Sequence, residues 1–211
     1  MGVNRESIAR HNQATREALL GVVLALLERG GDEELSYQSI AAKARVSQRT
    51  VFRYFPNHAA LREALVPVIR ERLSNVEPPD EPSELLPYID RLYRICEANA
   101  GLVHTLVNTE LGRAILHDER SRRLDKIRHS LARAAPDRTP SALRSAAALI
   151  RHQASGATWD FYRRQASLSL DDAIGTASLA VTAALESLGL LAPRSAATSS
   201  RAKGRGASRA R

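Results

Sequence analysis

Apolar residues recur every three to four positions through most of the chain, the spacing that an amphipathic helix needs to bury one face. The first such stripe consists of Leu19, Val22, Val23, Leu26 and Leu27. Gly30 and Gly31 follow it, and glycine commonly ends a helix. No segment of useful length alternates between apolar and polar residues as a strand would. The pattern therefore predicts an all-α protein.

The same periodicity predicts about nine helices in total, separated by proline, glycine and short polar segments. After the first helix we expect helices at residues 36–44, 47–55, 58–73, 83–99, 102–117, 119–135, 141–165 and 171–188. Ser36, Ser47 and Asn57 stand where they can cap the second, third and fourth of these. Pro67 falls inside the fourth, where its missing backbone donor can kink the helix.

Charge is distributed unevenly along the chain. The 31 Lys and Arg outnumber the 23 Asp and Glu, which gives a formal net charge of +8. Residues 1–56 carry +2, residues 57–193 are neutral, and residues 194–211 carry the remaining +6. A basic balance favours an acidic partner such as nucleic acid or an anionic membrane surface. The position of the positive charge along the chain matters more than the size of the net charge.

The last 18 residues contain no large apolar side chain. Such a segment cannot bury enough surface to offset the entropy lost on ordering, so we expect residues 194–211 to be a disordered basic tail. Together with the helix pattern this predicts an N-terminal domain over residues 1–57 and a helical domain over 58–193. The tail adds non-specific affinity for DNA or acts only as a solubilising segment.

Composition excludes several classes of protein. The single Cys96 allows no intrachain disulfide and no thiolate metal cage, and the six histidines show no ligand spacing, so we expect no metal and no cofactor. Glycine-rich phosphate loops and the common hydrolase motifs are missing, which argues against an enzyme. The longest apolar run is too short to span a bilayer and no signal-peptide core is present, so we expect a cytoplasmic protein.

Residues 35–58 combine two short helices with a turn of three to four residues, the size of a helix-turn-helix. Small Ala41 lets the two helices cross closely, and Val46 and Val51 fill the space between them. Ile40, Phe52 and Phe55 would complete a small core against the first long helix.

This segment has chemistry suited to DNA. Lys43, Arg45, Arg49 and Arg53 give it four positive charges and no acid. Glutamine can pair with adenine and arginine with guanine, so residues at the start of the second helix would read base edges while others contact phosphates. The predicted DNA-binding residues are Tyr37, Ser47, Gln48, Arg49, Thr50, Arg53, Tyr54 and His58. The alternative is a basic helical hairpin that merely faces solvent.

Residues 15–58 resemble the DNA-binding domain of the tetracycline-repressor (TetR) family of bacterial transcriptional regulators. The resemblance rests on Ser-Ile-Ala-x-x-Ala-x-Val-Ser at 39–47 and Thr-Val-Phe-Arg-Tyr-Phe-Pro-Asn at 50–57. It implies a homodimer that binds a palindromic operator, most often as a repressor, and leaves DNA when a small-molecule effector binds the C-terminal domain. Activation rather than repression stays open, because it depends on operator position.

Two residues depart from the family pattern. Arg45 stands where the family usually has glycine in the turn, and a left-handed conformation there would cost a non-glycine residue about 1–2 kcal/mol. The turn is therefore either strained or altered. His58 stands where the family often has lysine, and a neutral histidine attracts phosphate less, so DNA binding would strengthen as pH falls.

The resemblance also implies that the helices between about 83 and 165 enclose an effector site. Candidate lining residues are Tyr93, Cys96, His104, Asn108, Leu111, His152 and Trp159. Three of them, His104, Asn108 and Leu111, share one helix face. The alternative is that all seven are ordinary core residues whose polar atoms are satisfied.

The last two predicted helices have the composition of a dimer interface. Small residues at 146–148 and 154–158 would permit close helix approach, and a stripe on the last helix would pack across a two-fold axis. That stripe consists of Ile174, Ala177, Val181, Ala184, Leu185 and Leu188. The alternative is packing within one chain.

A second hypothesis for function is a non-specific DNA-binding or nucleoid-associated protein, in which the basic tail supplies most of the affinity. Sequence-selective binding that survives removal of the tail favours the regulator. Loss of all binding with the tail favours the alternative.

Overall fold

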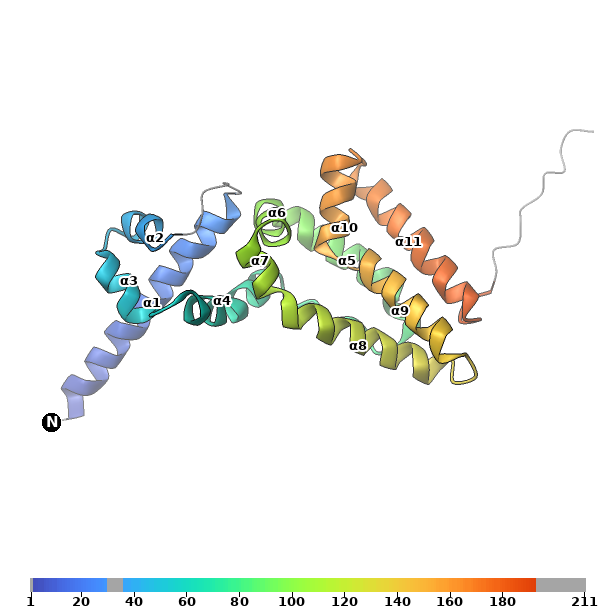
Figure 1. Ribbon diagram of the computed structural model, residues 1–211, viewed down its shortest axis with the longest axis horizontal. Helices are drawn as coiled ribbons and strands as arrows, with labels where there is room; N and C mark the ends of the chain where they lie inside the picture. The colour runs from blue at the N-terminus through green and yellow to red at the C-terminus, as the bar shows by residue number, and fades with distance from the viewer. Residues whose placement is uncertain (1, 30–35, 193–211) are drawn as a thin grey trace, which may run out of the picture.

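The computed structural model describes residues 2–29 and 36–192, which form 11 α-helices and no strand (Figure 1). The prediction of an all-α protein is confirmed. The α-helices are α1 (Gly2–Glu28), α2 (Tyr37–Ala44), α3 (Gln48–Tyr54), α4 (His58–Arg72), α5 (Leu85–Ala98), α6 (Ala100–Asn108), α7 (Glu110–Ile115), α8 (His117–Ala134), α9 (Pro140–Gln153), α10 (Gly156–Asp160) and α11 (Leu170–Ser187). A 3₁₀ turn precedes α5, and a π-helical turn, Phe161–Gln165, follows α10.

The predicted number of helices is too low because two predicted helices are each interrupted by a capping residue. Thr109 has an extended backbone, and its side chain accepts a hydrogen bond from the Gly112 N–H, which starts α7. Ser155 does the same for Thr158 and starts α10. Both residues lie inside continuous apolar periodicity, which conceals the breaks.

The predicted caps of the early helices are confirmed. The side chains of Ser36, Ser47 and Asn57 each accept a hydrogen bond from the backbone N–H three residues later. Pro67 lies within α4, as its position in the sequence predicted. The Gly30-Gly31 pair and the basic tail at 194–211 both lie outside the described residues.

Two hydrophobic cores organise the helices. One joins α1–α4 to part of α6 and α7, and the other joins α5, α8, α9 and α11. In Figure 1, α6 and α7 lie between the two groups of helices. Helix α6 belongs to both cores, since Leu102 and Leu106 pack into the first and Val103 into the second. Packing against the N-terminal helices therefore extends well beyond residue 57.

The end of α1 lies directly against the start of α6. A Cβ atom added at Gly101 would stand 1.9 Å from the carbonyl oxygen of Glu28, so only glycine fits there. One turn further along α6, the Thr105 hydroxyl donates a 2.9 Å hydrogen bond to the carbonyl oxygen of Leu27. These contacts fix α1 on the C-terminal helices.

The predicted dimer stripe on the last helix is wrong as an outward-facing surface. Ala177, Val181, Ala184, Leu185 and Leu188 are buried within this chain's own core, and Ile174 packs partly against it. Helix α11 turns this face towards α5 and α9, so intrachain packing accounts for it. Of the small residues on the preceding helices, Ala146, Ala147, Ala154 and Thr158 are likewise buried, whereas Ala148 and Ala157 are exposed.

Among the described helices, none is both long and apolar enough to cross a membrane.

Candidate functional site

The turn between α2 and α3 begins at a residue in the left-handed conformation. Arg45 has φ 56° and ψ 41°, and its N–H continues the hydrogen bonding of α2 to the carbonyl of Ala42. The turn thus has the left-handed conformation that glycine adopts most easily, with arginine in that position. Of the two alternatives, the turn is strained rather than altered.

Helix α3 presents its first residues to solvent. Ser47 caps the helix through the Thr50 N–H at 3.1 Å, and the two hydroxyls lie 2.9 Å apart. Gln48 and Arg49 are exposed, and neither side chain has a hydrogen-bond or ion-pair partner among the described residues. Two side chains with base-reading chemistry therefore project freely from the start of this helix.

The end of α3 is tied back to α1. The Arg53 guanidinium lies 4.9 Å from the centroid of the Tyr54 ring and donates to the Tyr54 hydroxyl at 3.3 Å. That hydroxyl donates in turn to Oδ1 of Asn12 on α1 at 3.2 Å. Arg53 and Tyr54 are therefore held in place before any ligand arrives, in contrast to Gln48 and Arg49.

Tyr37 joins the starts of α2 and α4. Its ring centroid lies 4.3 Å from that of Phe52 and 5.0 Å from that of His58. The Tyr37 hydroxyl is buried and has no hydrogen-bond partner among the described residues. The prediction that Phe52 fills the small core is wrong, because its side chain is 46% exposed and rests on Tyr37, whereas Ile40 and Phe55 are buried as expected.

Together these elements bring the eight predicted DNA-binding residues to one helix-turn-helix. Lys43, Arg45, Arg49 and Arg53 are all exposed there, with no acidic residue between positions 35 and 58. A positively charged surface of this kind neutralises phosphates, and the start of α3 is the part that such motifs insert into the major groove.

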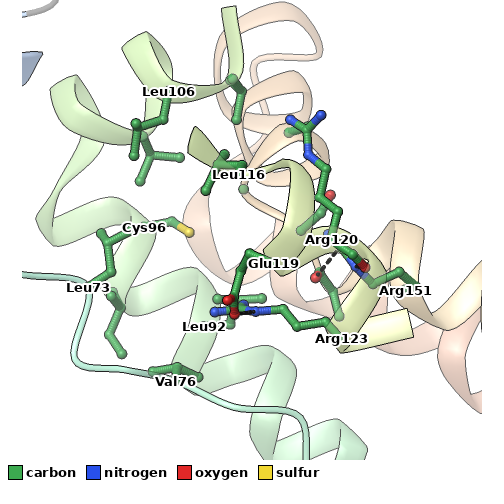
Figure 2. A pocket seen from close by; sticks show the side chains of 17 residues that line it. Leu73, Val76, Leu92, Cys96, Leu106, Leu116, Glu119, Arg120, Arg123 and Arg151 are labelled. Carbon is green, nitrogen blue, oxygen red and sulfur yellow. Dashed lines mark hydrogen bonds and ion pairs between the residues drawn. The ribbon is translucent and has the colours of Figure 1, made fainter. Parts of the chain in front are cut away.

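A cavity of about 100 Å³ lies between α5, α6, α8 and the α9–α10 junction (Figure 2). Most of its wall is apolar and comes from Leu73, Val76, Leu92, Ile95, Cys96, Val103, Leu106, Val107, Leu116, Ala154, Gly156 and Ala157. Its polar lining residues are Glu119, Arg120, Arg123, Arg151 and Ser155. A concave apolar site with a few polar groups is the usual form of a small-molecule site.

Of the seven predicted effector residues, only Cys96 lines this cavity. Burial raises the pKa of its thiol to about 12, so the thiol is neutral and contributes apolar surface. Tyr93 and Trp159 are buried beside it in the core. The Tyr93 hydroxyl donates to the carbonyl oxygen of Gln153 at 2.9 Å, and Trp159 Nε1 donates to Glu97 at 3.1 Å.

The other four lie elsewhere. His104 Nδ1 is 2.9 Å from Oδ1 of the buried Asp160, and the Asn108 amide donates to Oδ2 of the same residue at 3.2 Å. Leu111 packs against the N-terminal core, and His152 is exposed on α9. The shared face of His104 and Asn108 exists, but it meets α10 rather than the cavity.

The sequence reasoning missed the arginines of the cavity, although a signal for them is present. On α8 the core-facing stripe includes the partly buried Leu124 and the buried Ile127, and the positions four residues earlier on the same face are Arg120 and Arg123. Arginine at a core position of an amphipathic helix indicates a site with a polar or anionic occupant.

The chain thus combines a helix-turn-helix with an all-helical body that has its own cavity. Residues 19–65 match the family model of bacterial regulatory proteins of the tetR family. The fold of the whole chain is similar to that of a tetR-family transcriptional regulator from Streptomyces coelicolor, with 19% identity and a TM-score of 0.57 over 84% of this chain and 86% of that one. It is similar also to a TetR-like regulator from Rhodococcus sp. RHA1, with 19% identity and a TM-score of 0.57 over 83% of this chain and 96% of that one.

A search of curated proteins gives no match. Residues 19–65 are thus similar to the tetR family model, and the chain has the fold of these two regulators. The resemblance inferred from residues 15–58 is confirmed.

Proposed function

We propose that the chain is a homodimeric, sequence-specific DNA-binding regulator that releases its operator when a small molecule fills the cavity. The observation that carries this proposal is the pair Gln48 and Arg49, which project without partners from a basic helix-turn-helix. Repression is the default direction, because a protein bound across a promoter excludes polymerase. Release by an effector then turns the gene on.

The dimer forms through the outer face of α9 and α11. Residues 173–185 of α11 contain no charged side chain, and Leu179 on this helix is 59% exposed. Leu149 on α9 is 40% exposed, and Gly175 leaves open space around its Cα. An uncharged stretch of α11 with an exposed leucine, beside an exposed leucine on α9, suits a second copy of the same chain. Two copies give the helix-turn-helix its two half-sites.

The cavity communicates with the DNA-binding unit through shared residues. Leu106 lines the cavity and also packs in the N-terminal core, and Leu73 directly follows α4. An effector that shifts α6 or the end of α4 therefore shifts the helix-turn-helix with it. It changes DNA affinity only by the difference between its affinities for the two arrangements.

The test begins with selection of DNA sequences bound by the full chain, followed by competition titrations against random DNA. Arg49→Ala should lower affinity for the selected operator by about 1–3 kcal/mol and spare non-specific binding, because a base contact is lost. Arg53→Ala is the matched control. It removes the same charge from a position predicted to contact phosphate, so both kinds of binding should weaken together.

Equal losses for Arg49→Ala on operator and random DNA would contradict base reading by this residue. A chain lacking residues 194–211 distinguishes the sequence-specific regulator from the second hypothesis, a non-specific DNA-binding protein. If it loses all DNA binding, the protein is a non-specific DNA binder that depends on its basic tail.

A further inference from the structure

Three arginines line the cavity, and only one carboxylate accompanies them. Arg120, Arg123 and Arg151 carry three positive charges, and Glu119 is the single acid among the lining residues. Figure 2 shows Arg120 and Arg151 on the side opposite the apolar Leu73 and Val76. The cavity therefore has an apolar wall facing a wall with excess positive charge.

Both carboxylate oxygens of Glu119 already accept hydrogen bonds from arginines. Its Oε1 accepts hydrogen bonds from Arg122 at 2.6 Å and Arg123 at 2.7 Å, and its Oε2 accepts one from Arg70 at 2.6 Å. These three cations share one negative charge, and Glu77 supplies a second carboxylate only to Arg122. Glu119 thus cannot neutralise the other arginines of the wall.

Arg151 and Arg120 have no carboxylate partner among the described residues. Arg151 donates to the carbonyl oxygens of Ala154 at 3.2 Å and Arg120 at 3.5 Å, which are backbone acceptors. Burial lowers the pKa of Arg151, and the charges of Arg123 and Arg120 lower it further. The Arg120 guanidinium makes no hydrogen bond or ion pair within the described chain. A half-buried cation without a counter-charge costs free energy that an anionic ligand would recover.

Arg120 and Arg151 are therefore cavity-lining cations without a counter-charge among the described residues. Buried and partly buried cations are normally paired with an anion, and the described residues on this side of the cavity offer them none.

We infer that the effector is a small organic anion, with a carboxylate or phosphate head on Arg120 and Arg151 and a short apolar body against Leu73, Val76 and Cys96. This inference rests on the proposed role of the cavity as the effector site. Guanidinium groups bind carboxylate and phosphate oxygens through charge-assisted hydrogen bonds, which are the strong ones. A cation would meet net repulsion, and a neutral molecule would leave Arg120 and Arg151 without a counter-charge.

Binding is tested on the full chain without DNA, by isothermal titration calorimetry and thermal shift. Hexanoate and hexyl phosphate should bind, whereas hexanamide and hexylammonium, which keep the apolar body, should bind at least about tenfold more weakly. Comparison of the two anions identifies the preferred head group. Acetate and inorganic phosphate should bind weakly, because they lack the apolar body. Equal affinity for hexanamide and hexanoate would overturn the inference.

Three variants locate the anion. Arg120→Gln should weaken hexanoate binding by about tenfold or more, because it removes a charge that has no other partner. Arg151→Lys keeps the charge and should bind within a few-fold of the parent, which guards against a structural failure of variants that neutralise Arg151. Arg128→Gln, on the same helix but exposed and paired with Asp125 outside the cavity, is the matched control and should bind like the parent. Equal losses in Arg120→Gln and Arg128→Gln would contradict the assignment.

The outcomes separate this inference from the proposed function. Binding of hexanoate that leaves operator affinity unchanged supports the anion site but contradicts effector-controlled release. If no member of the series binds while Arg49→Ala still loses operator affinity selectively, the anion inference fails and the DNA-binding proposal stands.

Discussion

Glu119 on α8 holds Arg70 on α4 through a 2.6 Å hydrogen bond from the guanidinium to Oε2. The other oxygen of the same carboxylate is held by Arg123, which lines the cavity. One side chain therefore connects the cavity wall to the helix that follows the helix-turn-helix. If the proposed effector moves the Arg123 side chain, the carboxylate that Arg70 needs as its acceptor would be altered as well.

The hydrogen bonds between Glu119 and its arginine partners make the stability of the fold depend on pH in the acid range. Burial by itself would raise the pKa of Glu119, but hydrogen bonds from Arg123, Arg122 and Arg70 lower it to about 2. Because this pKa is depressed in the folded state, the unfolded chain binds more protons between about pH 4.5 and 2, and the contribution is lost as pH falls through that window.

Glu119→Gln tests this contribution. Urea unfolding should show the parent more stable than the variant by on the order of 2–3 kcal/mol at pH 7, with the difference constant down to about pH 5 and shrinking below it. Asp118→Asn removes an exposed carboxylate from the same first turn of α8 and is the control; because no arginine is paired with Asp118 among the described residues, this variant should lose much less stability at pH 7 than Glu119→Gln. A parent–variant difference that stays constant from pH 5 to 3 would contradict the assignment.

Arg45 should destabilise its own turn. Its φ of 56° is left-handed, which glycine adopts without steric cost, so Arg45→Gly is expected to raise the free energy of unfolding by about 0.5–1 kcal/mol. Lys43→Gly removes the same charge two residues earlier, inside α2, where glycine should lower stability by a similar amount. Chemical denaturation checks both, and a loss of stability in both variants would show that Arg45 is not strained.

Gly101 should be essential to the junction of α1 and α6. Gly101→Ala places a Cβ 1.9 Å from the Glu28 carbonyl oxygen, so the helices must separate, at a cost of about 2 kcal/mol or more. Gly21→Ala is the matched control on α1, because no atom lies within 4 Å of the added Cβ, and alanine should stabilise that helix by about 0.5–1 kcal/mol. Thermal unfolding measures both, and equal stabilisation by the two alanines would exclude the close contact.

Leu179 should be central to the dimer. Leu179→Glu places an unpaired charge in the proposed interface, so sedimentation at micromolar concentration should show monomers with unchanged helix content. Ala132→Glu adds the same charge on the exposed side of α8 and should leave the dimer intact. A dimer that persists in Leu179→Glu would assign the interface to another surface.

Much of the fold could be predicted from the sequence because local signals were strong. Helical apolar periodicity, N-capping residues and helix-breaking Pro and Gly predicted the positions of the early helices. The motifs at 39–47 and 50–57 predicted the position of the helix-turn-helix. The breaks at Thr109 and Ser155 could not be read, because apolar periodicity continues across them and either residue is also tolerated in a helix. Which face of α11 is buried depended on its packing against α5 and α9, which local sequence does not encode.

The cavity was harder to predict than the helix-turn-helix. Residue type suggested Tyr93, His104 and Trp159, but each of these satisfies its polar atom within the fold. Arg120 and Arg123 look like surface residues unless they are aligned with Leu124 and Ile127 along the helix. A side chain that lacks a partner is recognised only once the neighbouring helices are in place.

The two walls of the cavity have different freedom to evolve. Leu106 supports the N-terminal hydrophobic core as well as the cavity, so a substitution there that suits a new ligand would also disturb the packing beneath the helix-turn-helix. Ala157, on α10, is exposed and belongs to neither hydrophobic core. Relatives that respond to different molecules should therefore diverge first at the α9–α10 junction, while the α6 wall stays constant among proteins that read similar operators.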